Sequence, residues 1–496
     1  MELFWHRRDL RIADNVGLAT AADRDETGPV APVFVFDDDV LAHASDVRVR
    51  RLLDGLAALR AAYRERGSDL LVARGDPAEI LPALAERVDA ERVVWNRDYS
   101  GLARERDARV RRALAAVDVR REAHHDAVLH EPDSIRTNAG DPYSVYSYYW
   151  KKWRDRAVDP PAPTPEGDAL ASTAALSELT STETTSTRSD AVDVAVGELP
   201  TPADLGFAEP DVDLDPAGTD AARERLEAFL DDDVFGYAED RDYPARAATS
   251  RLSAHLRYGE IGVRETYAAT EEARVAASDR PETDAEESVE EFQAQLAWRE
   301  FYTQVLYHNP EVVTANYKTY EEGIDWRDDP EEIAAWKRGE TGYPIVDAGM
   351  RQLLAEGYMH NRVRMIVASF LTKDLLSDWR HGYDHFREHL ADHDTANDNG
   401  GWQWAASTGT DAQPYFRIFN PMTQGERYDP DAEYITTHVP ELRGVDPELI
   451  HEWPDLMAVQ RANAAPEYPD PIVDHGERRE AALAMFKRAR GEDPDE

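Results

Sequence analysis

Residues 398–421 read DNGGWQWAASTGTDAQPYFRIFNP, and this stretch decides the fold of the chain. It holds two tryptophans two residues apart, a tyrosine and two phenylalanines, mixed with many small polar residues. Aromatic surface next to convergent hydrogen-bonding groups is typical of a ligand pocket. The segments on either side indicate what kind of domain surrounds it.

The segments near this stretch have the periodicity of long helices. Residues 289–308 (VEEFQAQLAWREFYTQVLYH), 343–357 (YPIVDAGMRQLLAEG) and 361–379 (NRVRMIVASFLTKDLLSDW) repeat apolar positions every three to four residues. No comparable strand pattern occurs after about residue 200. The sequence therefore predicts a large all-α C-terminal domain over residues 216–490.

The first part of the chain alternates between strands and helices. Strand-like runs occur at residues 2–6, 29–37, 69–76 and 92–99, with helical patterns at 47–67 and 102–118. Such alternation predicts an α/β domain with a parallel, Rossmann-like sheet over residues 1–130. Its first strand-to-helix turn, HRRDLRIADN, contains no glycine, which argues against a dinucleotide-binding fingerprint there.

A connecting segment separates the two domains, at residues 131–215. Within it, residues 159–190 are rich in proline, serine and threonine and have little to bury. This composition predicts a flexible linker or a surface loop.

Composition limits the possible classes of protein. The chain has 496 residues, a net charge of -43, no cysteine and six lysines among 56 basic residues. Acid spread over the whole chain indicates a halophilic protein, although an ordinary acidic protein stays possible. Without cysteine, disulfides and thiolate chemistry are excluded, and we expect a reducing cytoplasm. No apolar run is long enough for a membrane span, and the charge disfavours non-specific nucleic-acid binding outside a local basic groove.

Several clusters in the helical half could carry chemistry. Thr249, Ser250 and Ser253 surround Arg251, as expected of either a phosphate site or an ordinary helix cap. Two other helical segments gather polar, aromatic and soft apolar side chains, and each could equally be a solvated helix face or a buried part of the core. These side chains are Trp298, Arg299, Asn361, Arg362, Arg364 and Met365.

An acidic loop precedes the aromatic stretch. Asp392, Asp394 and Asp398 have oxygen ligands at a spacing that calcium could use, but the glutamate that closes a calcium loop is missing. We therefore expect no metal at the site.

Taken together, the motifs identify a family. The run TGYPIVDAGMRQL…GYMHNRVRMIVASFLTKDLL…DWR…GGWQWAASTGTDAQPYFRIFNPMTQGE closely resembles the photolyase/cryptochrome family, and most closely its class I cyclobutane pyrimidine dimer photolyases of microbes. The resemblance extends to FWHRRDLRIADN, VVWNRDYS and IRTNAGDPYSVYSYYWKKW in the first half. It implies an α/β antenna domain and a helical domain that holds folded FAD.

The resemblance also implies roles for individual residues. The phosphate side of FAD would meet Tyr237, Thr249, Ser250, Arg251, Leu252 and Ser253. Its ribose and ring side would meet Asp392, His393 and Asp394, with Arg364 as their ion-pair partner and Asp398 beside the ring. The relay of electrons to the flavin would use Trp326, Trp379 and Trp402. The damaged DNA would contact Gln295, Trp298, Arg299, Asn361, Arg362, Met365, Trp404 and Gln424.

The implied activity is light-dependent DNA repair by a deoxyribodipyrimidine photo-lyase. Reduced FAD, excited by blue or near-UV light, donates an electron to a flipped-out cyclobutane dimer and splits it. The partner would be dimer-containing DNA, the protein a monomer, and the second chromophore 8-hydroxy-5-deazaflavin or methenyltetrahydrofolate.

Two positions depart from the repair pattern. Gln295 stands where photolyases carry a glutamate. Asp398 stands where photolyases carry an asparagine, and in this it resembles plant cryptochromes. A signalling cryptochrome is therefore one alternative. A (6-4) photolyase is another, although that subgroup places histidines where this chain has Asn361 and Met365.

Overall fold

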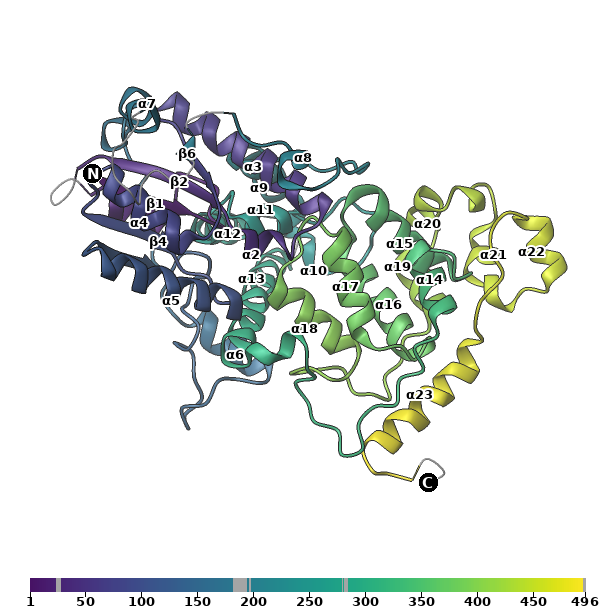
Figure 1. Ribbon diagram of the computed structural model, residues 1–496. Helices are drawn as coiled ribbons and strands as arrows, with labels where there is room; N and C mark the ends of the chain where they lie inside the picture. Colours follow the sequence, from purple (N-terminus) through teal and green to yellow (C-terminus); the bar gives the residue numbers. More distant parts are fainter. Residues whose placement is uncertain (24–27, 182–193, 196–197, 279, 281–283, 494–496) are drawn as a thin grey trace.

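The computed structural model describes residues 1–23, 28–181, 194–195, 198–278, 280 and 284–493. Figure 1 shows a sheet with its helices at one end of the molecule and a larger helical part at the other. The C-terminal helix α23 (His475–Ala489) runs along the outside of the helical part.

The N-terminal domain is built on one sheet. Its strands lie in the order β5-β4-β1-β2-β3-β6. They are β1 (Glu2–His6), β2 (Val30–Phe36), β3 (Leu71–Arg74), β4 (Arg92–Asn96), β5 (Arg120–His124) and β6 (Val194–Ala195). The first five are parallel, as predicted, whereas β6 pairs antiparallel with β3 at the edge. Because the order reverses between β1 and β4, a crevice is expected at the carboxyl ends of these strands.

Helices cover both faces of this sheet. One face packs on α1 (Val16–Ala21) and α3 (Asp46–Glu65), and the other on α4 (Pro77–Arg87) and α5 (Gly101–Ala116). Strand β1 is buried along its whole length, as a central strand of a doubly covered parallel sheet must be.

Part of the segment predicted as a flexible linker is helical. Helix α7 (Thr173–Ser181) follows a short turn of 3₁₀ helix, and Leu176 is fully buried against the sheet core. The prediction of a linker or loop was wrong here, because Leu170, Ala171 and Leu176 supply the apolar contacts that the overall composition concealed. Residues 159–166 contain no helix or strand, and residues 182–190 lie outside the described residues.

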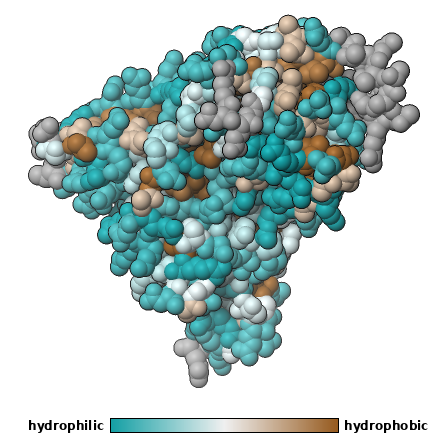
Figure 2. Space-filling view, turned by 90° about the vertical axis from the view of Figure 1, so that its left-hand side faces the viewer, coloured by the Kyte–Doolittle hydropathy of each residue, from teal (hydrophilic) through white to brown (hydrophobic). Residues whose placement is uncertain are grey.

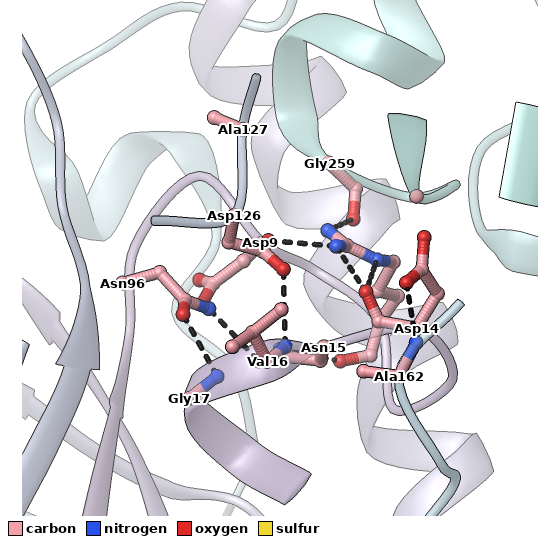
Figure 3. A network of polar contacts seen from close by, with 12 residues as sticks. Asp9, Asp14, Asn15, Val16, Gly17, Asn96, Asp126, Ala127, Ala162 and Gly259 are labelled. Atoms are coloured by element: carbon pink, nitrogen blue, oxygen red, sulfur yellow. Dashed lines mark hydrogen bonds and ion pairs between the residues drawn. The ribbon is translucent and has the colours of Figure 1, made fainter. Parts of the chain in front are cut away.

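The loop between β1 and α1 is filled by the protein's own polar groups (Figure 3). The backbone N–H of Val16 donates to Asp126 Oδ1 (3.0 Å), and that of Gly17 donates to Asn96 Oδ1 (2.9 Å). These are the donors that a dinucleotide phosphate would need at the start of α1. The polar network therefore agrees with the missing glycine fingerprint.

The helical part surrounds the long helix α13 (Ala285–His308). Its remaining helices are α9 (Thr219–Asp231), α10 (Tyr237–Asp240), α11 (Ser253–Tyr258), α12 (Val263–Ala277), α14 (Pro330–Arg338), α15 (Pro344–Glu356), α16 (Asn361–Ser369), α17 (Trp379–His389), α18 (Thr395–Ala405), α19 (Pro421–Tyr428), α20 (Glu433–His438), α21 (Pro447–His451) and α22 (Ala458–Ala464). Helix α2 (Asp38–Leu41) follows β2 within the sheet domain, and the connection to the helical part includes α6 (Tyr146–Arg154) and α8 (Pro202–Leu205). Packing of α13 against α10, α12 and α18 places the aromatic stretch beside the middle of the domain.

The face drawn in Figure 2 is mostly hydrophilic, with small apolar patches scattered over it. Within the described ranges, every helix is too short or too polar to cross a bilayer.

Candidate functional site

Two cavities lie on either side of a polar wall. The first, which we call the helical cavity, has a volume of about 460 Å³ and is lined by α10, α11, α13, α16, α17 and α18. The second, the interdomain cavity, has a volume of about 230 Å³ and lies between the carboxyl edge of the sheet and α11, α13 and α18. Three charged residues line both cavities and form the wall: Arg257, Arg299 and Asp394.

Most of the site residues predicted from the sequence meet in the helical cavity. Its lining includes Tyr237, Ser250, Leu252, Ser253, Gln295, Trp298, Arg299, Asn361, Arg364, Met365, Asp392, Asp394, Asp398, Trp402 and Trp404. Those that the structure places outside this lining are Thr249, Arg251, Trp326, Arg362, Trp379, His393 and Gln424.

Acidic side chains line part of the helical cavity. Arg364 donates to Asp392 Oδ2 (2.8 Å), while Asp392 Oδ1 is buried with no hydrogen-bond partner among the described residues. Asp398 lies 3.8 Å from the Arg364 guanidinium and 2.6 Å from His393 Nδ1. Burial lowers the pKa of His393, although Asp398 acts in the opposite direction. His393 therefore lies behind Asp398 and supports it without lining the cavity.

Asp394 caps the helix that carries the two tryptophans. Its side chain accepts from the backbone N–H groups of Ala396 and Asn397 at the start of α18. Burial alone would raise the pKa of Asp394, but Arg8 and Arg257, with Arg299, hold it far below its ordinary value. Asp394 is therefore a fixed negative charge inside the polar wall.

Aromatic side chains also line the helical cavity. Trp298 stacks on Tyr146, with ring centroids 3.6 Å apart and planes inclined by 11°. Trp404 packs near Phe419, 6.5 Å away, and Gln295 donates to Glu291 Oε1 (3.1 Å). A planar ring beside these residues would meet the stacked Trp298 ring and the Gln295 amide, which Glu291 already holds in place.

The predicted residues outside the lining have other partners. Arg251 has a left-handed φ of 47° and pairs with Asp215 (3.3 Å), and Arg362 donates to Asp242 (2.5 Å). Thr249 lies in the loop before Arg251, and Gln424 is half-buried on α19.

The three predicted relay tryptophans differ in environment. Trp402 lines the helical cavity, and its buried Nε1 has no hydrogen-bond partner among the described residues. Trp379 is fully buried and donates to Asn316, and Trp326 is half-buried against Phe486. The sequence analysis missed Trp336, whose ring centroid lies 6.0 Å from that of Trp402. It is one tryptophan on an amphipathic helix, and no local pattern distinguishes it from other core residues.

Arg8 and Arg257 were also missed. Both are close to Asp394, and Arg8 follows the first strand, far from Asp394 in the sequence. For Arg8, the sequence signal was the charged run HRRD, which follows a strand-like run directly. Active-site side chains of α/β domains often lie at this position, after a strand.

Comparisons with known proteins assign the chain to a family. Residues 2–166 match the family described as DNA photolyase, and residues 292–488 match the FAD binding domain of DNA photolyase. The chain is 61% identical over 501 residues to the deoxyribodipyrimidine photo-lyase of Halobacterium salinarum, covering 99% of this chain and 100% of that protein. The chain belongs to the photolyase family. A relative from Halobacterium also fits the acidic, lysine-poor composition that predicts a halophile.

Two solved photolyase structures have the same fold. A bacterial class III photolyase from Agrobacterium tumefaciens is 36% identical, with a TM-score of 0.83 and coverage of 99% of this chain and 98% of that one. An archaeal photolyase from Sulfolobus tokodaii, whose two FAD molecules are described as implying a novel light-harvesting cofactor, is 31% identical. Its TM-score is 0.77, and the match covers 98% of this chain and all of that one.

The helical cavity fits the FAD of a photolyase. Among the described residues, it offers an unpartnered acceptor, Asp392 Oδ1, and an unpartnered donor, Trp402 Nε1, both at buried positions where a polar ligand could bond them. Hydroxyl groups from Ser250 and Ser253 line the same cavity. The residues present therefore suit a ligand with a polar ring edge and a phosphate-bearing chain.

Proposed function

We propose that the chain is a deoxyribodipyrimidine photo-lyase, which splits cyclobutane pyrimidine dimers in DNA when illuminated. One observation carries the proposal: Asp392 and Asp398 line the same cavity as Trp298 and Trp404. A flavin beside the acidic side chains and an extruded dimer beside the aromatic side chains would then share one cavity.

On the cofactor side, Arg364 orients Asp392, and Asp394 fixes the start of α18. Ser250 and Ser253 would bind the phosphate groups of FAD. Bound FAD, once reduced and excited by light, supplies the electron that opens the cyclobutane ring. The protein contributes binding, orientation and a fixed charge pattern.

On the DNA side, the Trp298–Tyr146 stack forms one wall for the extruded bases. Unstacking a damaged base pair costs less free energy than unstacking an intact one, and aromatic contact stabilises the extruded bases. Asn361 and Met365 on α16 would complete the pocket, and Gln295 would hydrogen-bond to a pyrimidine carbonyl.

Illumination tests the proposal directly. The protein purified under mild conditions should contain FAD, and it should remove cyclobutane dimers from an oligonucleotide in blue light and not in darkness. Equal dimer loss in light and darkness, or a preparation free of flavin, would overturn the assignment.

The same assay separates the alternatives. A (6-4) photolyase would repair the (6-4) photoproduct instead of the cyclobutane dimer. A signalling cryptochrome, which Asp398 favours, would photoreduce its flavin and repair neither lesion. We expect repair of the cyclobutane dimer by a cytoplasmic monomer, whose oligomeric state size-exclusion chromatography with light scattering would measure.

The interdomain cavity is our candidate for the second chromophore. Aromatic and apolar side chains line it from the sheet, among them Trp5, Phe34 and Phe36, while Asp37 and Arg106 supply polar groups. Both 8-hydroxy-5-deazaflavin and methenyltetrahydrofolate combine a flat ring with polar edges. The absorption spectrum of the purified protein, followed by mass spectrometry of the released chromophore, would decide between them.

A further inference from the structure

Helix α17 carries two histidines and a glutamate on its last two turns. The sequence HFREH places His385, Glu388 and His389 so that one ligand atom from each lies within 4.8 Å of the others. In the part of the chain that the structure describes, this is the only group of three or more histidine, aspartate or glutamate side chains that could hold a metal ion. None of the three residues lines the helical cavity or the interdomain cavity.

One ring nitrogen of the buried His385 has no hydrogen-bond partner among the described residues. His385 is 4% exposed, and its Nε2 is buried with no hydrogen-bond partner among the described residues. Its ring centroid lies 4.4 Å from that of His389, one turn further along the helix. An unsatisfied buried polar atom is costly, so a nitrogen left in this position needs a physical explanation. A bound cation would provide one.

The other two side chains of the group, His389 and Glu388, are accessible to solvent. The side chains of His389 and Glu388 are 28% and 67% exposed, and Glu388 Oε2 lies 3.8 Å from His389 Nε2. An ion could therefore enter from solvent and keep water in its remaining positions. Lys337 on α14 lies close enough to both histidines to oppose a cation, and the Glu388 carboxylate offsets that charge.

The ligand types define the class of ion. Two imidazoles and one carboxylate suit zinc and its neighbours among the divalent transition metals, whereas calcium and magnesium prefer oxygen ligands alone. The spacing H-x-x-E-H also brings two histidines to one face of a helix in a class of zinc enzymes. We propose that His385, Glu388 and His389 form a binding site for a divalent transition-metal ion, with zinc as the best match.

The site lies next to residues of the helical cavity. The His385 ring is 5.6 Å from that of Trp336, and Trp336 is 6.0 Å from Trp402. Phe386, the residue after His385, lines the helical cavity and packs 4.9 Å from Trp402. A metal that links the last two turns of α17 would therefore stabilise the helix that supports one wall of the cavity.

Zinc retention by the FAD-containing protein tests this site. The protein is dialysed against zinc at pH 8, where a histidine of ordinary pKa is neutral, in about 1 M KCl to screen diffuse binding by surface acids. We expect one equivalent of zinc by elemental analysis, and loss of that equivalent in His389→Ala. His381→Ala, which removes an exposed histidine of the same helix outside the group, is the matched control and should retain it.

A second measurement excludes a folding artefact. His389 is partly exposed, so His389→Ala should keep its FAD content and circular dichroism, and cobalt should give ligand-field bands in wild type that are absent from the variant. Glu388→Gln should weaken zinc binding without changing the FAD content. Wild-type protein that retains no zinc, or equal zinc in wild type and His389→Ala, would overturn the proposal.

Discussion

Arg8 donates a hydrogen bond to Asp394 Oδ2 over 2.6 Å, joining two residues that are 386 positions apart in the chain. Arg8 follows the first strand of the sheet, and Asp394 caps the helix that carries Trp402 and Trp404. Arg257, 3.9 Å from the same carboxylate, belongs to the wall between the two cavities. The ion pair therefore fixes the sheet domain against the candidate flavin site.

Removal of the Arg8–Asp394 ion pair should lower the stability of the fold and weaken the retention of FAD. Hydrogen bonds to charged groups contribute about 1.5–3 kcal/mol, so Arg8→Ala should lower the free energy of unfolding by about 2 kcal/mol. It should also release FAD faster, measured by the increase in flavin fluorescence after dilution. Arg50→Ala, which breaks an exposed ion pair with Glu209, should cost less than about 1 kcal/mol. Equal effects of the two substitutions would contradict the role of Arg8.

Trp402→Phe should block photoreduction of oxidised flavin but leave repair intact when the flavin is reduced chemically. Phenylalanine is much harder to oxidise than tryptophan, and Trp402 is the predicted relay residue that lines the helical cavity. Transient absorption after a light pulse measures the loss. Trp336→Phe is the matched control, because its ring contacts Trp402 outside the predicted relay. Normal photoreduction in Trp402→Phe would show that electrons take another route.

Binding to damaged duplex DNA should depend only weakly on salt. The net charge of -43 leaves few phosphate contacts, and Arg362, a predicted DNA contact, is the candidate for one of them. Each phosphate contact contributes about 0.9 to the slope of log K against log salt concentration. Arg362→Ala should reduce the slope by about this amount, in titrations of a dimer-containing duplex at several salt concentrations. A steep wild-type slope, or an unchanged slope in the variant, would contradict this prediction.

The ionisation of Asp98 should make the free energy of unfolding depend on pH under acidic conditions. Burial by itself would raise the pKa of Asp98, but Arg8 and three further arginines lower it to about 2. Because the pKa is lower in the folded protein than the ordinary 3.8, the ionised carboxylate stabilises the fold above pH 3.8. That contribution, about 2 kcal/mol, is lost as the pH falls toward 2.

Asp98→Asn tests this dependence. The variant should be less stable than wild type at pH 7 by about 2 kcal/mol, and the difference should disappear between pH of about 4 and 2. Denaturant unfolding followed by circular dichroism at each pH measures it. A difference that stays constant across this range would assign the effect to packing and not to charge.

The sequence by itself determined the parallel sheet and the helical second half, and its polar and aromatic clusters include many residues that line the helical cavity, whereas Tyr237, Leu252 and Gln295 were named only from the family resemblance. Strand and helix periodicities are local, and so are the clusters around Ser250, Asn361 and Asp392, so each can be recognised within one short segment. The glycine-free first turn likewise predicted a loop without a dinucleotide site, and the structure shows its backbone donors bonded to Asp126 and Asn96.

The tertiary structure alone decided which side chains meet. Arg8 reaches Asp394, Trp336 reaches Trp402, and Leu176 buries a helix within a segment whose composition resembles a loop. The same packing leaves His385 Nε2 buried without a partner among the described residues. These outcomes depend on contacts between distant segments, whose energies arise from burial and charge in the assembled core, and local periodicity carries no information about them.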